Sequence, residues 1–154
     1  MSNSYIQLYI HFVIAVTYKA ATIQVEWEDQ LHNHIKGIVQ NNLHKMLAIN
    51  SLPDHVHIFI GMNARQSISQ LMDLAKQGSA DFINDNKFTQ KKFHWQEGYG
   101  AFGNHLSEIG EVVKYISNQK EQHRKITFRE EFINMLNKNG VDYDEKDIFH
   151  ELLD

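Results

Sequence analysis

The sequence predicts an α+β protein of the ferredoxin-like type, in which an antiparallel sheet is covered on one face by two helices. The order of the expected elements predicts this fold. The expected elements follow the order strand, helix, strand, strand, helix, strand, and further helices come after the last strand. This order is the split β-α-β arrangement. A chain of 154 residues is long enough to bury one core, so we expect a single domain over residues 1–154.

The first strand is expected within residues 5–18, which are rich in aromatic and β-branched side chains and contain no helix or strand breaker. Its nearly continuous apolarity indicates a central position in the sheet. Residues 26–42 follow as an amphipathic helix. Their apolar side chains recur every three or four positions, at Trp27, Leu31, Ile35, Ile38 and Val39.

Residues 43–50 form the second expected strand, and residues 51–54 the turn of a hairpin into a third strand that begins at His55. Residues 67–84 have a helical apolar pattern, with Ser67 as the N-cap. A polar loop leads to a fourth strand over residues 93–102, in which two glycines indicate a bulge or a close backbone approach.

The C-terminal part is expected to be helical, with a third helix over residues 107–125 and a shorter one over residues 127–139 that Gly140 closes. The start of the third helix can shift by a residue or two, because Ser107 has no capping-box partner. Residues 141–154 form a tail with six acidic side chains and one lysine, whose apolar side chains we expect to dock on the domain.

The third strand carries the first candidate site. Side chains alternate between the two faces of a strand, so His55 and His57 share one face while Val56 and Ile58 share the other. If helices cover the aliphatic face, the two imidazoles lie on the face that they leave uncovered. Two histidines so placed are either ordinary half-exposed side chains or ligands of one divalent cation.

The third helix carries the second candidate. Residues four apart are neighbours on a helix, so Tyr115, Gln119 and His123 form one row beside the apolar stripe. Alone, such residues usually serve packing or solvation. Together with the two histidines, the Gln119 amide could complete a metal site that polarises a phosphodiester, and the Tyr115 phenol could attack the phosphorus.

His55-Val56-His57 on a strand, followed by Tyr115 and Gln119 on a later helix, resembles the HUH single-tyrosine transposases. This family includes small insertion-sequence transposases and REP-associated tyrosine transposases. The resemblance extends over nearly the whole chain, in order, through residues 9–13, 54–58, 95–102, 115–125, 128–132 and 140–145.

The resemblance implies that His55, His57 and Gln119 bind Mg²⁺ or Mn²⁺ and that Tyr115 is the nucleophile, which makes the third helix catalytic. It implies cleavage of single-stranded DNA beside hairpins through a 5′-phosphotyrosine, followed by strand transfer. It also implies a homodimer, in which the tyrosine helix reaches the metal site of its own chain or of its partner.

The formal net charge of −4 is weak for a DNA-binding protein, but the acidic tail accounts for it. Residues 1–140 carry 14 basic and 13 acidic side chains. Candidate phosphate contacts are Lys91, Lys92, Arg124 and Lys125, although solvated lysines are common.

Two other functions remain open: a catalytically silent protein that binds DNA hairpins, and an unrelated metalloenzyme such as an iron oxygenase. The second needs a carboxylate beside the histidines, and Asp54 is poorly placed for that role because it points to the other strand face.

The sequence contains no cysteine, which excludes disulfides, thiolate-bound zinc and a thiol nucleophile. With no export signal visible at the start, we expect a cytoplasmic protein that associates with DNA.

Overall fold

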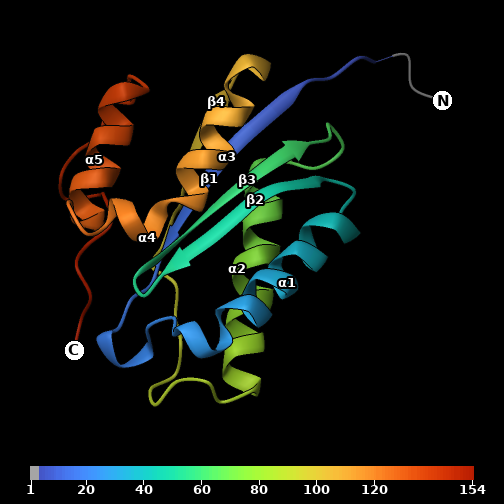
Figure 1. The fold of residues 1–154 in the computed structure, drawn as a ribbon. Coiled ribbons are helices and arrows are strands. Elements are labelled where there is room, and N and C mark those ends of the chain that lie inside the picture. The colour runs from blue at the N-terminus through green and yellow to red at the C-terminus, as the bar shows by residue number, and fades with distance from the viewer. Residues whose placement is uncertain (1–3) are drawn as a thin grey trace.

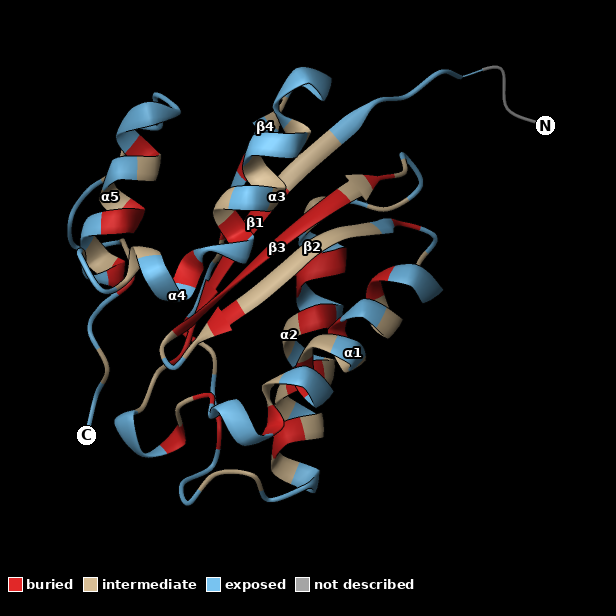
Figure 2. Ribbon diagram, in the orientation of Figure 1, coloured by how far each residue is buried: buried red, intermediate tan, exposed pale blue. Residues whose placement is uncertain are grey.

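The structure, a computed structural model, describes residues 4–154. Its centre is a four-stranded antiparallel sheet with the order β2-β3-β1-β4 (Figure 1). The strands are β1 (Leu8–Ala15), β2 (Lys45–Leu52), β3 (His55–Met62) and β4 (Gly100–Asn104). Of the two central strands, β3 is buried over nearly its whole length and β1 from His11 onward, as Figure 2 shows. The α+β fold class predicted from the sequence is therefore confirmed.

One face of the sheet packs against α1 (Val25–Asn41) and α2 (Ile68–Asp85). The side chains of this main core that come from the two central strands are Phe12, Ile14, Val56, Ile58, Ile60 and Met62. They alternate along their strands with residues of the opposite face, as the pleat requires. The Ser67 side chain caps α2 in a reciprocal capping box with Gln70, which fixes where the helix begins.

The opposite face is covered by the C-terminal helices α3 (Ile109–Ser117), α4 (Gln119–Gln122) and α5 (Phe128–Lys138) (Figure 1). A second core forms under α5 from Val13, Ala15, Phe102, Phe128, Phe132, Leu136 and Phe149. Val13 pairs with His57 and Ala15 with His55 in the sheet, so both histidines also belong to this face. The face that α1 and α2 leave free is thus the one that α3, α4 and α5 cover.

The first strand is shorter than expected and the second is shifted by two residues, and two later elements differ more. The fourth strand spans Gly100–Asn104 and not residues 93–102, because Gly98 adopts a φ of 81° and turns the chain; before it, Trp95 makes only an isolated bridge to Val16. The expected helix over residues 107–125 is divided: a 3₁₀ turn capped by His105 precedes α3, and the chain leaves helical geometry at Asn118 before α4.

The tail docks as expected. The Phe149 side chain is buried in the second core, and Leu153 forms a parallel bridge with Tyr18. The buried Gln96 side chain donates hydrogen bonds to the carbonyl groups of Val16 and His150 and accepts one from the His150 N–H. In residues 4–154, no helix is long and apolar enough to cross a membrane.

Candidate active site

Strand β3 holds His55 and His57 side by side on the face covered by the C-terminal helices. Both side chains are completely buried, and their ring centroids lie 5.0 Å apart. The Phe128 ring of α5 stacks on the His55 ring, with centroids 4.0 Å apart. The two histidines are therefore not solvated surface residues. Any group that contacts their Nε2 atoms, the inner nitrogens, must come from α3, α4, α5 or the segments between them.

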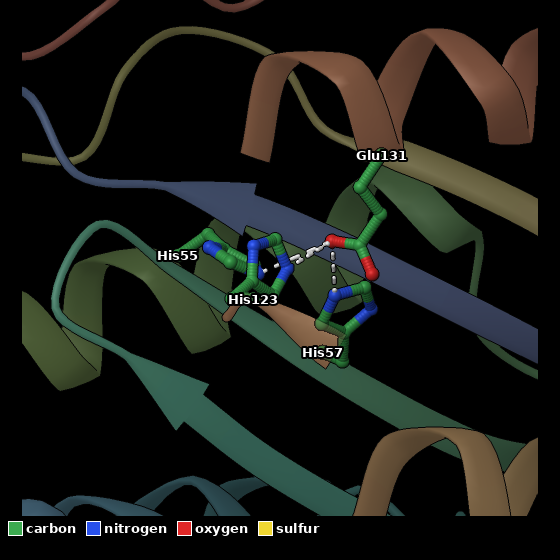
Figure 3. A group of neighbouring side chains, drawn as sticks. All are labelled: His55, His57, His123 and Glu131. Carbon is green, nitrogen blue, oxygen red and sulfur yellow. Dashed lines mark hydrogen bonds and ion pairs between the residues drawn. The ribbon is translucent and has the colours of Figure 1, made fainter. Parts of the chain in front are cut away.

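A carboxylate from α5 lies in the middle of this group. Oε1 of Glu131 lies 3.3 Å from Nε2 of His55, 3.1 Å from Nε2 of His57 and 2.9 Å from Nε2 of His123 (Figure 3). His123 comes from the segment that follows α4, so the four side chains derive from three parts of the chain. Their nearest ligand atoms all lie within 4.8 Å of one another, which is a spacing that one metal ion could bridge.

The second oxygen of Glu131 faces the two residues predicted on the third helix. Oε2 accepts a hydrogen bond from the Tyr115 hydroxyl group and another, 2.8 Å long, from Nε2 of Gln119. Oε1 of Gln119 lies 3.3 Å from Nε2 of His55. The fold thus brings the predicted tyrosine, glutamine and two histidines into one cluster. Glu131, for which the sequence predicts no role, connects them.

The Nδ1 atoms of His55 and His57, the outer nitrogens, also have hydrogen-bond partners. Nδ1 of His55 lies 2.7 Å from Oδ1 of Asp54, and Nδ1 of His57 lies 2.7 Å from Nε2 of the buried His11. Asp54 belongs to the turn before β3 and contacts His55 from the side away from Glu131. Contacts of this kind fix the tautomer and the orientation of a metal-binding imidazole.

Burial and charge together set the proton affinities of the cluster. Burial lowers the pKa of His57, and burial and the neighbouring His57 lower the pKa of His11 to about 3. Burial opposes protonation of His55 as well, but hydrogen bonds to Asp54 and Glu131 outweigh it and raise the pKa of His55. Burial alone would raise the pKa of Glu131, yet hydrogen bonds from the three histidines hold that pKa far below its usual value.

Tyr115 is partly buried at the edge of the cluster. Burial and the Glu131 carboxylate raise the pKa of the Tyr115 phenol. Its side chain also lines a cavity of about 390 Å³ between α3, α5 and β4. Apolar side chains such as Phe102 share this cavity with a larger number of polar and charged ones, which include the carboxylates of Glu108 and Glu111.

Sequence reasoning missed Glu131, although the sequence holds a signal for it. Glu131 lies three residues after Phe128 and four before Met135, so it falls within the apolar stripe of α5. A carboxylate on the buried face of a helix needs partners, because burying an unpaired charge is costly. His123 lies in the same helical row as Tyr115 and Gln119, and only the fold reveals that its imidazole faces Glu131.

The four candidate phosphate contacts divide into two pairs. Lys91 lies over the Tyr18 ring and donates a hydrogen bond to the carbonyl group of Asp154, while Lys92 is exposed. Arg124 and Lys125 line an open groove of about 600 Å³ that reaches Asp54 and His123. Arg124 and Lys125 therefore lie beside the cluster.

Comparisons with known proteins agree with this fold. A profile of the family described as "Transposase IS200 like" matches residues 4–119, which is most of the chain. The chain therefore belongs to the IS200-like transposase family. The ISDra2 transposase TnpA of Deinococcus radiodurans is 23% identical over 121 residues, which cover 75% of this chain and 86% of that protein.

Two solved structures share the fold. A transposase structure from Deinococcus radiodurans has a TM-score of 0.62 at 20% identity and covers 77% of this chain and 95% of its own. A REP-associated tyrosine transposase bound to a REP hairpin has a TM-score of 0.61 at 14% identity and covers 100% of this chain and 93% of its own. The family profile ends at Gln119, so His123 and Glu131 lie beyond the matched residues.

Proposed function

We propose that this transposase cleaves and rejoins single-stranded DNA beside hairpins, with Tyr115 as nucleophile and a divalent metal ion, Mg²⁺ or Mn²⁺, held by His55, His57 and Gln119. The observation that carries the proposal is the joint position of these groups. The Tyr115 hydroxyl and the inner nitrogens of His55 and His57 all contact the carboxylate of Glu131, although Tyr115 lies 58 residues beyond His57.

The donor atoms fit a divalent ion. His55 and His57 present their Nε2 atoms to one buried space, and Oε1 of Gln119 lies 3.3 Å from Nε2 of His55. The hydrogen bond from Nδ1 of His55 to Asp54 keeps Nε2 of that ring available to an ion. An ion bound there would supply a Lewis acid that stabilises the charge developing on a phosphodiester.

Tyr115 would perform the covalent step. Its hydroxyl oxygen forms a bond to phosphorus while the bond between phosphorus and the 3′ oxygen of the preceding nucleotide breaks. The phenol loses its proton to water, and the departing oxygen takes one up, so that the products are a 5′-phosphotyrosine and a free 3′-hydroxyl. In rejoining, a 3′-hydroxyl attacks the phosphotyrosine, and the phenol regains a proton.

Two surface features beside Tyr115 and His123 support a DNA substrate. The cavity lined by Tyr115 has the volume of a small-ligand pocket and could receive a nucleotide next to the scissile phosphate. The groove lined by Arg124 and Lys125 offers positive charge for the DNA backbone on the other side of the cluster, and we include Lys91 and Lys92 as more distant contacts. The solved relative bound to a REP hairpin supports a hairpin substrate, and the family resemblance favours a homodimer.

The test is covalent capture. Labelled single-stranded hairpin DNA from the sequence flanking the gene is incubated with the protein and Mn²⁺, and the products are separated on a denaturing protein gel beside Tyr115→Phe. We expect a shifted, labelled band that the Tyr115→Phe variant lacks. A matched control is Tyr99→Phe, because Tyr99 packs against the main core on the other side of the sheet.

The result also separates the alternatives. If the hairpin is retained on a native gel but no adduct forms under any metal condition, the protein is a silent hairpin-binding relative. An adduct that persists in Tyr115→Phe would contradict the assignment of the nucleophile.

A further inference from the structure

The outer nitrogens of His55 and His123 face hydrogen-bond acceptors, and that of His57 faces another imidazole. Nδ1 of His55 lies 2.7 Å from the Asp54 carboxylate, and Nδ1 of His123 lies 3.1 Å from the carbonyl oxygen of Ile126. Neither oxygen can donate a proton, so each Nδ1 must carry the hydrogen of the contact. Nδ1 of His57 and Nε2 of His11 share one hydrogen at 2.7 Å. In the neutral form of His55 and His123, the lone pair therefore sits on Nε2.

These Nε2 atoms converge on a single oxygen. Oε1 of Glu131 lies between 2.9 and 3.3 Å from the Nε2 atoms of His55, His57 and His123. If the rings are neutral, the lone pairs of two or three nitrogens and one carboxylate oxygen point at each other in a space almost without solvent. Such an arrangement is repulsive unless positive charge lies among the four atoms.

We propose that His123 and Glu131 are metal ligands, which add a third imidazole and a carboxylate to the site proposed at His55, His57 and Gln119. This inference rests on the metal site of the proposed function and extends it by two residues. An ion bound there would be held by the Nε2 atoms and by Oε1 of Glu131, while Oε2 keeps its hydrogen bonds to Tyr115 and Gln119. Gln119 then also orients the carboxylate, in addition to presenting its own oxygen near His55.

Burial and packing support this assignment. Glu131 is 1% exposed, and its helix is fixed on both sides of it by Phe128 and Phe132, which are buried in the second core. The side chain of His123 is 11% exposed. Both candidate ligands are thus held in place without the ion and need little rearrangement to bind it, which is the usual condition for a strong site.

The donor set also predicts which ion binds. Mg²⁺ prefers an octahedral shell of oxygen atoms and keeps several waters, whereas imidazole nitrogens suit first-row transition metals. A site with three imidazoles, one carboxylate and one amide oxygen should therefore bind Mn²⁺ more tightly than Mg²⁺.

The experiment is isothermal titration of the full chain, freed of metal with EDTA and dialysed, with MnCl₂ and with MgCl₂ in the absence of DNA. The variants are Glu131→Gln and His123→Gln. Glu130→Gln is the matched control, since Glu130 is the exposed neighbour on the same helix and glutamine can preserve its capping box with Thr127. Circular dichroism in EDTA establishes that each variant is folded before it is titrated.

We expect the Kd for Mn²⁺ to rise at least about tenfold in Glu131→Gln and in His123→Gln and to stay unchanged in Glu130→Gln. In the wild-type chain the Kd for Mg²⁺ should exceed that for Mn²⁺ at least about tenfold. If Glu131→Gln fails to fold, the less buried His123→Gln carries the test alone.

The failures are distinguishable. If both variants bind Mn²⁺ like the wild type while His57→Gln does not, His123 and Glu131 are not ligands, and the metal site of the proposed function stands without them. If the wild-type chain binds neither ion, the four side chains share protons instead of a metal, and both the inference and the metal-dependent part of the proposed function are overturned.

Discussion

The hydroxyl group of Tyr115 on α3 donates a hydrogen bond to the carboxylate of Glu131 on α5, sixteen residues later in the chain. This contact joins the proposed nucleophile to the histidine cluster. It also has an electrostatic effect, because a negative charge beside a phenol opposes the formation of phenolate. In the protein without metal, Tyr115 is therefore held in its protonated form.

Replacing that carboxylate should make Tyr115 easier to ionise. Burial and Glu131 both raise the pKa of the Tyr115 phenol, and Glu131→Gln removes the second cause while the first remains. We expect the metal-free variant to form phenolate at lower pH than the wild type does. The measurement is an alkaline titration followed by NMR of ¹³C-labelled tyrosine, with Tyr115→Phe used to assign the signal. An unchanged midpoint would show that the carboxylate does not act on the phenol.

The position of α5 depends on a glycine in β4. A Cβ atom at Gly100 would lie 2.7 Å from Cε1 of Phe132, the residue that follows Glu131. We expect Gly100→Ala to lower the free energy of unfolding by about 1–3 kcal/mol, because α5 must move away from the sheet. Displacement of α5 should also weaken Mn²⁺ binding.

A matched control for this change lies three residues away on the same strand. A Cβ atom at Gly103 would meet nothing within 4 Å, so Gly103→Ala should leave both properties nearly unchanged. Urea unfolding and Mn²⁺ titration of the two variants test the prediction. Equal effects of the two substitutions would show that the contact between Gly100 and Phe132 does not position α5.

The Gln96 side chain anchors the acidic tail to the rest of the domain. It makes three hydrogen bonds to the backbone of Val16 and His150, and all lie in a buried or partly buried setting. Gln96→Ala leaves these backbone groups without partners, which costs about 1–3 kcal/mol. We expect faster hydrogen exchange and proteolysis around Phe149 in this variant. Gln77→Ala, on the exposed side of α2, is the control, and equal protection of the tail in both variants would contradict the role of Gln96.

The fold followed from local patterns in the sequence. Period-two alternation placed His55 and His57 on one face, and helical periodicity found α1 and α2 nearly to their ends. The predicted boundaries of the fourth strand and the third helix were wrong, because the backbone conformation of a single residue interrupts each of these predicted elements. Gly98 at a positive φ separates the extended stretch around Trp95 from β4, and a break at Asn118 ends α3. Neither of these backbone changes alters the pattern of apolar residues from which the strands and helices are predicted.

The site was predictable in part for the same reason. Spacing on one strand or one helix relates His55 to His57 and Tyr115 to Gln119, but only tertiary packing relates Glu131 to either pair. The position of Glu131 within the apolar stripe of α5 indicated burial without indicating a partner. The partners are set by how α5 packs on the sheet, where Phe132 lies against Gly100 of β4, and local periodicity does not encode that contact.

A histidine outside the cluster gives a prediction for the pH dependence of stability. Burial lowers the pKa of His32 on α1; Glu28 and Asp29 partly oppose this effect, and Lys120 of α4 adds to it. Nε2 of His32 also lies 2.8 Å from Oγ of Ser51 on β2. Since the folded chain resists a proton that the unfolded chain accepts below about pH 6.5, this residue should reduce the free energy of unfolding as the pH falls through that value. At higher pH both states leave His32 neutral, and the effect disappears.

The comparison of the wild type with His32→Gln isolates this contribution, because glutamine can keep a hydrogen bond to Ser51 but does not titrate. We expect the free energy of unfolding to fall more steeply in the wild type than in the variant as the pH is lowered from about 7.5 to about 5.5. Urea unfolding at several pH values, in EDTA so that metal binding does not contribute, gives both curves. Parallel curves would mean that the folded protein accommodates a protonated His32 as readily as the unfolded chain does. A steeper fall in the variant would reverse the sign and require that the attraction of Glu28 and Asp29 outweighs burial.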